Sequence, residues 1–569
     1  MFSNKLLSCV LLIFCVHAAI AWLQNRPQRV GADVPAGKLR SLSFAPYREG
    51  FSPILHRYPL QQHIEADVEL VADKTQAIRT YSVQGGMQPT PAFARKYGLE
   101  MILGGWLGNH MLSNNNEVAT LIKTANANPD VVKRVLVGSE TLLRRDIDVD
   151  QLIGYIRQVK QAVNQPVSYA DVWSIYLRYP QLMREVDFIT IHILPYWEDE
   201  PVAVEQAIAH VEKIIQQVER QARELGIDKP ILIGESGWPA AGRQRGYAEP
   251  GVVNATRYIR GLIEIANRHG LDYNIVEAFN QPWKSQHEGV VGANWGLLSA
   301  DRKPVFPLTG PVQEHPNWST LLALATALWL LLTADYFRKL EGVSEARIVV
   351  FLAFAQILAV CLVSMADYLW FTSYSFGQRA YTLAMLTVNT GLGVCLLQRS
   401  FAILTNQSAK PILARRLRNA YLFFTVLAAY KTYSLAFFGR YMSFPVEEFA
   451  IPALGVCGLI VCLRTNETSW NRDILKFNRL VGDAPRLCWD RVPAYLLSLG
   501  VVALVLGETL GFMSAYDFVQ AHPTFSEGLP VALSYTLKNG QLLNWVLCIL
   551  VLSIPYWSNP GCKTDHWWV

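Results

Sequence analysis

The chain has 569 residues, which is too long for one ordinary domain, and 51% of them are hydrophobic, which is high for a soluble protein. Its formal net charge of +5 is modest, and the basic residues of the C-terminal half gather in particular loops, so the charge indicates membrane topology and not nucleic-acid binding. None of the nine cysteines lies between residues 24 and 315, and no Cys/His cluster has the spacing of a metal site. We therefore expect no disulfide in that region, no metal and no cofactor.

The first 23 residues have the pattern of a membrane-targeting segment. A short basic start precedes an apolar run in which Ala19-Ile20-Ala21 resembles a signal-peptidase site, so a cleaved signal peptide and a retained anchor are both open. We expect residues 1–23 to form this segment and residues 24–315 to form an extracytoplasmic globular domain. A proline-spaced linker then leads into residues 316–569, which we expect to form a transmembrane region.

About seven apolar segments of the C-terminal half are long enough to span a bilayer. They cover residues 318–335, 347–371, 380–398, 419–438, 446–463, 493–513 and 540–557. The loops between them are alternately rich and poor in basic residues. The basic-rich loops contain Arg338, Lys339 and Arg347, then Arg399, Lys410, Arg415, Arg416 and Arg418, then Arg464, Arg472, Lys476, Arg479, Arg486 and Arg491. Because basic loops stay in the cytoplasm, the alternation predicts a multi-pass inner (plasma) membrane protein whose globular domain is periplasmic and whose C-terminus is cytoplasmic.

Three ionisable residues, Asp367, Lys431 and Glu508, lie within the predicted spans. Charged groups are costly in hydrocarbon and are candidates for function. The alternative is that they lie near span ends or form pairs.

Before the linker, short apolar or β-branched runs alternate with amphipathic helical stretches. The predicted strands are Leu39–Ala45, Ile78–Ser82, Leu99–Leu103, Lys133–Val137, Val167–Ala170, Phe188–His192, Pro230–Gly234 and Tyr273–Phe279. The predicted helices lie near 64–76, 115–126, 149–163, 202–225 and 252–269. Eight strands with intervening helices predict an α/β fold, a (β/α)8 TIM barrel, followed by the all-α multi-span transmembrane region. A doubly wound open sheet is the alternative, but no glycine-rich phosphate loop follows the first strand.

Two glutamates, Glu140 and Glu235, lie just past the ends of the fourth and seventh predicted strands. Catalytic residues of (β/α)8 barrels sit at the C-terminal ends of strands, and these two strands face each other across the barrel mouth. Two carboxyl groups about 5 Å apart are the machinery of a retaining glycosidase. We predict Glu235 as the nucleophile and Glu140 as the acid/base, with the pKa of the acid raised. The alternative for each is a salt-bridged glutamate at the barrel rim.

Aromatic side chains crowd the same ends of the strands. They are Tyr81, Trp106, Trp173, Tyr196, Trp197, Trp238, Trp283 and Trp295. Sugar faces pack on flat rings while sugar hydroxyls need polar partners, so these residues and Lys284 are candidates for substrate binding. About half of the rings are expected to be core; the predicted substrate-binding rings are Tyr81, Trp173, Tyr196, Trp238, Trp283 and Trp295. His192 could be a hydrogen-bonded core residue or a site residue.

Several short motifs occur in a specific order. They are Ser43-Phe44-Ala45-Pro46, Arg79-Thr80-Tyr81, Val137-Gly138-Ser139-Glu140, Gly234-Glu235-Ser236-Gly237-Trp238-Pro239, Glu277-Ala278-Phe279-Asn280-Gln281-Pro282-Trp283-Lys284 and Asn294-Trp295-Gly296-Leu297. In them the sequence resembles glycoside hydrolase family 17, the β-1,3-glucanases and glucanosyltransferases. The resemblance implies a retaining mechanism with Glu235 as nucleophile and Glu140 as proton donor. Ser139 stands where the family usually has an Asn that bonds the sugar 2-hydroxyl, and Gln281 stands where it often has an acid, so both are added to the predicted substrate-binding residues.

The whole architecture also resembles bacterial membrane-bound members of the family that are described as β-1,6-glucan synthases. This resemblance implies a retaining enzyme that cleaves β-1,3-glucosidic bonds and passes the glucosyl segment to an acceptor or to water. The expected partners are a β-1,3-glucan or oligosaccharide donor and acceptor and the lipid bilayer, without nucleic acid; a glucan synthase or export partner is open. The alternative is a non-catalytic glucan-binding membrane component of a glucan assembly or export system.

Overall fold

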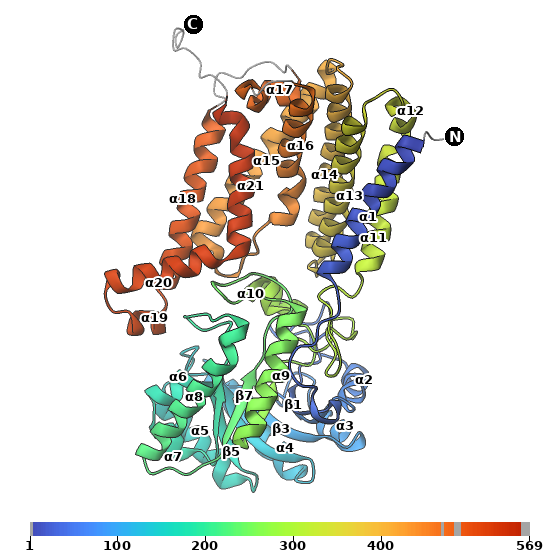
Figure 1. Ribbon diagram of the computed structural model, residues 1–569. Coiled ribbons are helices and arrows are strands. Elements are labelled where there is room, and N and C mark those ends of the chain that lie inside the picture. Colours follow the sequence, from blue (N-terminus) through green and yellow to red (C-terminus); the bar gives the residue numbers. More distant parts are fainter. Residues whose placement is uncertain (1–3, 468–470, 483–490, 559–569) are drawn as a thin grey trace. The chain divides into compact units, whose positions relative to one another are not determined.

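The protein is described by a computed structural model that covers residues 4–467, 471–482 and 491–558. Arg486 and the C-terminal residues that were predicted to be cytoplasmic lie outside these ranges. The chain divides into two compact units (Figure 1). One is the barrel unit, Pro27–Glu314, and the other is the helical unit, which joins Met1–Arg26 to His315–Val569.

The barrel unit contains a closed barrel of eight parallel strands in sequential order. The strands are β1 (Leu39–Ser43), β2 (Thr75–Arg79), β3 (Glu100–Gly105), β4 (Val132–Ser139), β5 (Val167–Val172), β6 (Ile189–His192), β7 (Ile231–Ser236) and β8 (Asp272–Ile275). The barrel closes where Leu42 of β1 pairs with Ile275 of β8. The (β/α)8 prediction is therefore confirmed, and the open-sheet alternative is wrong.

Helices cover the outside of the barrel (Figure 1). They are α2 (Gln61–Val71), α3 (Thr90–Lys96), α4 (Met111–Ala127), α5 (Val149–Ala162), α6 (Trp173–Arg178), α7 (Gln181–Glu185), α8 (Val204–Glu224), α9 (Val252–His269) and α10 (Ser285–Gly292). In α8 the apolar residues at three- and four-residue spacing, among them Val211, Ile215 and Val218, are fully buried. The helix α9 ends at Gly270, whose φ of +64° is the left-handed conformation that terminates many helices.

Several strand limits differ from the prediction, and the two largest differences lie at the ends of β2 and β8. The second strand ends at Arg79, three residues before the predicted end, and β8 ends at Ile275, before the predicted end at Phe279. Pairing with neighbours decides these limits, because Arg79 is the last residue of β2 that pairs with both β1 and β3. Arg79 therefore lies at the mouth of the barrel.

The interior of the barrel is apolar in one layer and polar above it. Ile102, Leu136, Ala170, Phe188 and Leu232 form a separate buried cluster inside the strands. A buried polar layer also lies inside, where the Asn274 side chain donates to Ser43 Oγ at 2.7 Å and to the Gly234 carbonyl at 2.9 Å. Buried polar groups must be hydrogen-bonded, so this layer gives the mouth of the barrel a rigid polar floor.

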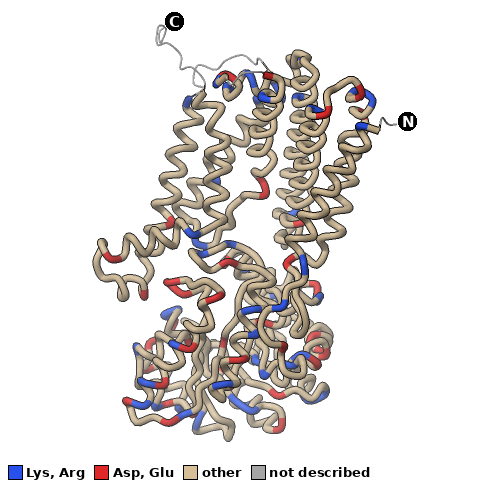
Figure 2. Tube along the Cα trace, viewed as in Figure 1, with Lys and Arg blue, Asp and Glu red and all other residues tan. Residues whose placement is uncertain are grey.

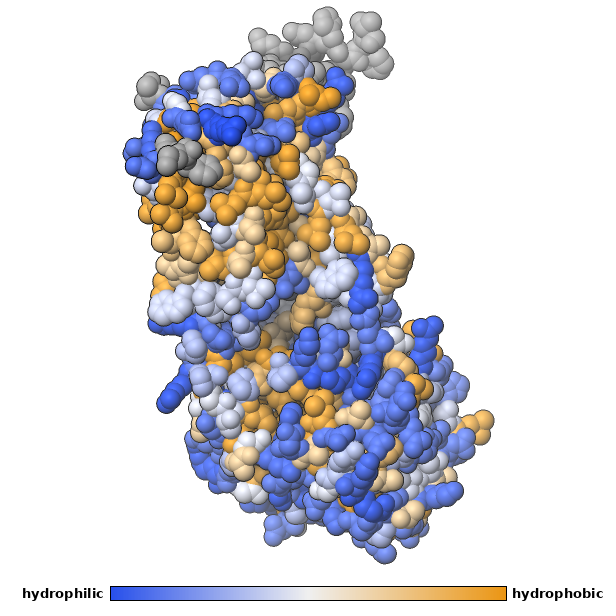
Figure 3. Space-filling view, turned by 90° about the vertical axis from the view of Figure 1, so that its right-hand side faces the viewer, coloured by the Kyte–Doolittle hydropathy of each residue, from blue (hydrophilic) through white to orange (hydrophobic). Residues whose placement is uncertain are grey.

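The helical unit contains eight helices that are long and apolar enough to cross a membrane among the described residues. They comprise α1 (Asn4–Gln24), α11 (Trp318–Thr333, continued to Leu340 by η3 and α12), α13 (Glu345–Phe371), α14 (Phe376–Leu404), α15 (Pro411–Phe438, continued to Tyr441 by η4), α16 (Val446–Asn466), α18 (Val492–Met513) and α21 (Gly540–Trp557). Charged residues are sparse along these helices and gather near their ends (Figure 2), and the surface between the ends is largely hydrophobic (Figure 3). The short helices α19 (Tyr516–Ala521) and α20 (Phe525–Lys538) connect α18 to α21.

The basic-rich segments of the helical unit are joined by hydrogen bonds. Lys5 donates to the Val343 carbonyl at 3.0 Å, Arg347 donates to the Leu404 carbonyl at 3.0 Å, and Arg399 donates to the Arg479 carbonyl at 2.7 Å. These contacts place the N-terminus of α1 and the three basic-rich segments at one end of this unit.

The ionisable residues predicted within spans have different surroundings. Lys431 on α15 pairs with Glu448 on α16 at 3.4 Å, and Glu448 also accepts a hydrogen bond from Tyr381 on α14 at 2.5 Å. Asp367 is exposed, two turns or less from the end of α13, and Glu508 is half-buried on α18. The pairing of Lys431 shows how a charge can be accommodated among these helices.

Candidate active site

The carboxylate of Glu235 is held by an arginine from the opposite part of the barrel. Glu235 is the fifth residue of β7, and Arg79 is the last residue of β2. Arg79 Nη1 donates to Glu235 Oε1 at 2.9 Å and to the Gly234 carbonyl at 2.7 Å, and Nη2 donates to Ser139 Oγ at 3.1 Å. The exposed fractions of the two side chains are 1% for Arg79 and 11% for Glu235. A buried carboxylate needs such a partner, and the ion pair fixes the orientation of the Glu235 side chain.

Glu140 occupies a tight turn that begins where β4 ends. Its φ of +53° lies in the left-handed region, which is uncommon for residues with a side chain and is often associated with functional sites. Its backbone N–H donates to the Ala170 carbonyl of β5 at 2.8 Å. The turn is held from below by Tyr169, whose hydroxyl accepts from the Leu142 N–H at 2.9 Å and donates to the buried carboxylate of Asp171. The chain thereby projects the Glu140 side chain into the mouth, where 27% of it is exposed.

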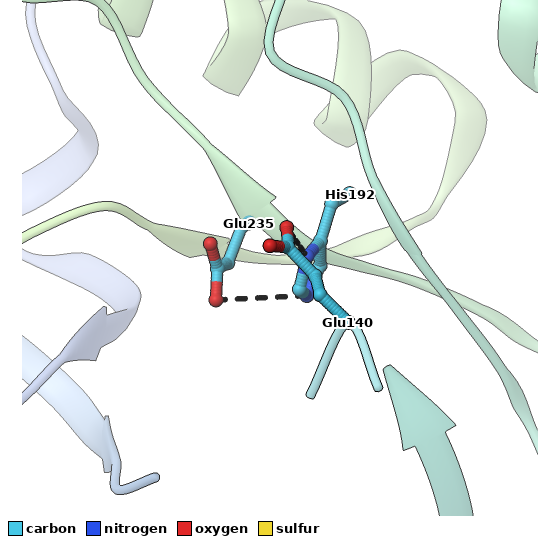
Figure 4. A group of neighbouring side chains, drawn as sticks. All are labelled: Glu140, His192 and Glu235. Carbon is cyan, nitrogen blue, oxygen red and sulfur yellow. Dashed lines mark hydrogen bonds and ion pairs between the residues drawn. The ribbon is translucent and has the colours of Figure 1, made fainter. Parts of the chain in front are cut away.

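The ring of His192 has one nitrogen beside each of the two glutamates (Figure 4). Its Nδ1 is 2.8 Å from Glu140 Oε1, and its Nε2 is 3.6 Å from Glu235 Oε1. The register shift between Ile191 and His192 in the pairing of β6 with β7 brings His192 opposite Glu235. One carboxylate oxygen of each glutamate and one ring nitrogen of His192 all lie within 4.8 Å of one another.

Such a group of donor atoms could also bind a metal ion, as two carboxylates and an imidazole are common ligands. Here the guanidinium of Arg79 already lies 2.9 Å from Glu235 and 3.3 Å from His192 Nε2. A cation added at this point would be repelled by that positive charge. The arrangement therefore favours an acid–base site over a metal centre.

The pKa of Glu140 lies below its ordinary value. Burial raises it, but the hydrogen bond from His192 and the charges of Arg144 and Arg79 outweigh burial. The prediction of a raised pKa for the acid is thus wrong for the protein without substrate. The physical reason is the hydrogen bond from His192, which stabilises the ionised carboxylate.

A second carboxylate–cation pair lies after β8. Lys284 Nζ donates to Glu277 Oε1 at 3.0 Å, and the Glu277 side chain is only 3% exposed. Burial raises the pKa of Glu277 to about 7, although Lys284 opposes the shift. Burial alone would lower the pKa of Lys284, but the charges of Glu277 and Glu288 raise it. The sequence-predicted Lys284 therefore binds Glu277 directly and keeps its positive charge near the mouth.

Three of the predicted aromatic residues are half-buried. Tyr81 donates its hydroxyl to Ser43 Oγ at 2.8 Å, and its ring lies 4.8 Å from the Arg79 guanidinium. Trp173 donates to Glu198 at 3.3 Å, and the Trp283 ring packs edge-on against Tyr47. Each retains exposed surface on which a sugar could pack.

Other predicted substrate-binding residues are buried. Tyr196 and Trp238 are 0% and 1% exposed, and their rings contact each other with centroids 6.1 Å apart. Trp295, 4% exposed, stacks on Trp197. Gln281 is fully buried and donates to the Ala45 carbonyl at 2.7 Å.

These burials correct part of the prediction. The rings of Tyr196, Trp238 and Trp295 have little or no free face for a sugar, so the expected stacking role does not fit them, and they instead pack beneath the mouth. Gln281 joins the segment after β8 to the segment after β1, so it positions Trp283, which donates to its side-chain oxygen at 2.9 Å. Ser139 is 7% exposed, and its hydroxyl accepts a hydrogen bond from Arg79 Nη2.

The predicted site did not include Arg79, and left His192 open. Position was the signal that could have found both residues, because each is the last residue of a barrel strand and therefore lies at the mouth. Asp171 gave a weaker signal, since a carboxylate one residue before the end of β5 could equally have been solvated. Burial raises the pKa of Asp171 to about 6, and the charge of Glu140 contributes to the shift.

Comparison with known proteins places the barrel among glycosidases. Residues 41–296 match the family model of the BtgE/BtgC glycoside hydrolase domain. A glucan 1,3-beta-glucosidase of Arthroderma benhamiae is 29% identical over 282 residues, which are 46% of this chain and 91% of that protein. A glucan 1,3-beta-glucosidase of Schizosaccharomyces pombe is 28% identical over 40% of this chain and 74% of that protein.

Among solved structures, a glycoside hydrolase family 17 beta-1,3-glucanosyltransferase from Rhizomucor miehei shares 28% identity. The superposition has a TM-score of 0.41 and covers 47% of this chain and 95% of that one. The assignment rests on the family model and the sequence relatives, which agree. The barrel, residues 41–296, is therefore a glycoside hydrolase domain similar to those of the BtgE/BtgC model, which supports the resemblance to family 17, and the protein is a glycoside hydrolase or transglycosylase.

Proposed function

We propose that the protein is a retaining β-glucan-active enzyme in which Glu235 is the nucleophile and Glu140 is the acid/base. The observation that carries the proposal is the short separation of the two carboxylates, whose nearest oxygens lie within 4.8 Å. Retaining glycosidases place their carboxyl groups about 5–5.5 Å apart, whereas inverting enzymes need about 6.5–9.5 Å to admit a water molecule. The separation favours direct attack by a carboxylate.

The neighbours of each carboxylate support these roles. Arg79 forms an ion pair with Glu235 and orients its carboxylate, as a nucleophile requires. In the first step Glu235 bonds to the anomeric carbon while the glycosidic C–O bond breaks and a protonated Glu140 gives its proton to the leaving oxygen. In the second step an acceptor hydroxyl gives its proton to Glu140 and displaces Glu235 from the glycosyl-enzyme.

For the substrate we propose β-1,3-linked glucan as donor. The printed activities of the two fungal relatives, both glucan 1,3-beta-glucosidases, support this linkage. The half-buried rings of Tyr81, Trp173 and Trp283 at the mouth offer packing surfaces for sugar rings. Water and a sugar hydroxyl would follow the same second step, so hydrolysis and transfer differ only in which acceptor occupies the site.

We further propose that the enzyme is a multi-pass inner (plasma) membrane protein whose barrel lies on the extracytoplasmic side. The support is the eight apolar helices and the basic-rich segments at one end of the helical unit, which the positive-inside rule assigns to the cytoplasm. The packing of α1 against α13, where Gln356 donates to His17 at 2.7 Å, supports retention of α1 as a span. Protease added to intact spheroplasts should then degrade the barrel, and its protection until the membrane is opened would contradict this topology.

The catalytic proposal is tested with the full chain in detergent and laminari-oligosaccharides as substrates. We expect products longer than the donor if transfer dominates, only shorter ones if hydrolysis dominates, and the β-anomer first in either case. Glu235→Gln should lower the rate about 10⁴-fold or more, and Glu264→Gln, an exposed glutamate on α9, is the matched control. Full activity of Glu235→Gln, or an α-anomer formed first, would exclude the mechanism.

A further inference from the structure

His192 is buried at the centre of the candidate site, where four elements supply charged groups around it. Its side chain is 0% exposed. Facing it are Arg79 from β2, Glu140 after β4, Asp171 from β5 and Glu235 from β7. A core histidine needs only hydrogen-bond partners for its ring nitrogens. Here each ring nitrogen of His192 faces a different one of the two proposed catalytic carboxylates, so the residue belongs to the candidate site.

The neighbours of the ring assign its tautomer. Nε2 lies 3.3 Å from Arg79 Nη1, which is a hydrogen-bond donor with no lone pair to offer. Two N–H groups pointing at each other would repel, and Glu235 Oε1, 3.6 Å from Nε2, lies beyond hydrogen-bond distance, so Nε2 is the nitrogen without a proton. The proton of the neutral ring therefore lies on Nδ1, 2.8 Å from Glu140 Oε1, and Nδ1–H donates to that oxygen.

This bond makes the two oxygens of Glu140 unequal. Oε1 accepts from His192, whereas Oε2 has no hydrogen-bond partner among the residues that the structure describes. When the carboxyl group takes up a proton, Oε1 cannot carry it without opposing Nδ1–H, so the proton must go to Oε2. The oxygen left without a protein partner is then the one that is able to exchange a proton with substrate.

We propose that His192 is a positioning residue that holds Oε1 of Glu140 through Nδ1–H and thereby assigns the catalytic proton to Oε2. This inference rests on the proposed function of Glu140. The fold makes room for the ring, because a Cβ at Gly234 would lie 3.2 Å from His192 Cδ2 and 2.5 Å from Thr190 Cγ2. The absence of a side chain at Gly234, next to Glu235 in β7, thus provides the space in which the His192 ring contacts both carboxylates.

Three variants of the full chain separate this role from packing. The amide nitrogen of His192→Asn is as many bonds from Cβ as Nδ1 and can replace its donor, whereas the amide of His192→Gln reaches the position of Nε2. His192→Leu removes both nitrogens. Two substrates form the readout: 2,4-dinitrophenyl β-laminaribioside, whose phenolate leaves without a proton, and laminaripentaose, whose sugar leaving group needs one.

We expect His192→Leu and His192→Gln to lower kcat/KM for laminaripentaose about tenfold to a hundredfold, as for the loss of one hydrogen bond to a charged group. The aryl substrate should lose less than about threefold, and His192→Asn should recover most of the activity on laminaripentaose. Because the bond from His192 lowers the pKa of Glu140, His192→Leu should also move the alkaline limb of the pH profile to higher pH.

Equal losses on both substrates would overturn the inference, as would a His192→Asn variant no better than His192→Gln. If His192→Leu does not fold, the comparison of the Asn and Gln variants decides. Wild type and Glu235→Gln are assayed alongside. An inactive wild type, or an active Glu235→Gln variant, would contradict the proposed function itself. If the wild type is active and Glu235→Gln is inactive, but the His192 variants lose equal activity on both substrates, only the role of His192 is contradicted.

Discussion

The ion pair between Arg79 and Glu235 provides a quantitative test of how the mouth of the barrel is stabilised. Replacement of Arg79 by Met keeps most of the side-chain volume and removes the charge. The Gly234 carbonyl would still accept from Asn274 at 2.9 Å, so it would not be orphaned. The main cost is therefore the carboxylate of Glu235, which stays buried without its counter-ion.

Breaking one side of a buried ion pair typically costs about 3–5 kcal/mol. We expect Arg79→Met to lower the free energy of unfolding of the barrel by that amount. Arg157→Met is the matched control, because Arg157 forms two hydrogen bonds to Glu185, at 2.6 and 2.8 Å, but its side chain is 62% exposed. The solvent replaces an exposed pair, so this variant should change stability little.

The measurement is pulse proteolysis of the full chain in detergent over a urea series, in which the intact barrel fragment is quantified. The difference between the urea midpoints of Arg79→Met and wild type, multiplied by the slope of the transition, gives the change in free energy. If the Arg79→Met and Arg157→Met midpoints shift equally, the assignment of the buried ion pair as a major stabilising contact is refuted.

Three further outcomes follow from the same structure. The pKa of Glu277 in the folded state, about 7, lies above its ordinary value of 4.5. As the pH rises between these values, the wild type should therefore lose stability relative to Glu277→Gln, by at most about 1.4 kcal/mol per pH unit. A difference between the two unfolding free energies that does not change with pH would disprove this. Trp238→Ala should lower the unfolding free energy by about 3–5 kcal/mol, because a fully buried indole is removed; a shift below about 1 kcal/mol would show that the ring is not core. The methyl group of Gly234→Ala would push on Thr190 and His192. The loss in kcat on laminari-oligosaccharides, expressed as a free energy, should therefore exceed the loss in the free energy of unfolding, and a kcat equal to that of the wild type would show that the His192 ring can move aside.

The sequence determined the class of fold because the relevant signals are local. Eight strand patterns with five helical stretches among them precede the proline-spaced linker, and a helix such as α8 shows its buried face as three- and four-residue spacing. The limits of strands were less well predicted. The end of β2 at Arg79 depends on which residues pair with β1 and β3, and that pairing is not encoded in the local pattern.

Part of the candidate site could be predicted in the same way. In a parallel barrel every strand ends at the same rim, so Glu140 and Glu235 could be placed together from their positions just past the predicted fourth and seventh strands. The aromatic residues could not be sorted by this rule. Trp173 and Trp238 both lie at strand ends, yet Trp173 is half-buried and Trp238 is 1% exposed. Their burial depends on which rings pack against them from distant segments.

What the sequence by itself determined was therefore the barrel, about seven apolar spans after the linker and the two glutamates at one rim, because period, strand order and residue type are local properties. Only the tertiary structure decided that Arg79 holds Glu235, that His192 bonds Glu140, and that the pKa of Glu140 lies below its ordinary value. These contacts join residues 52 to 156 positions apart in the chain. Their strength depends on distance, direction and exclusion of water, which are set when the strands close into a barrel.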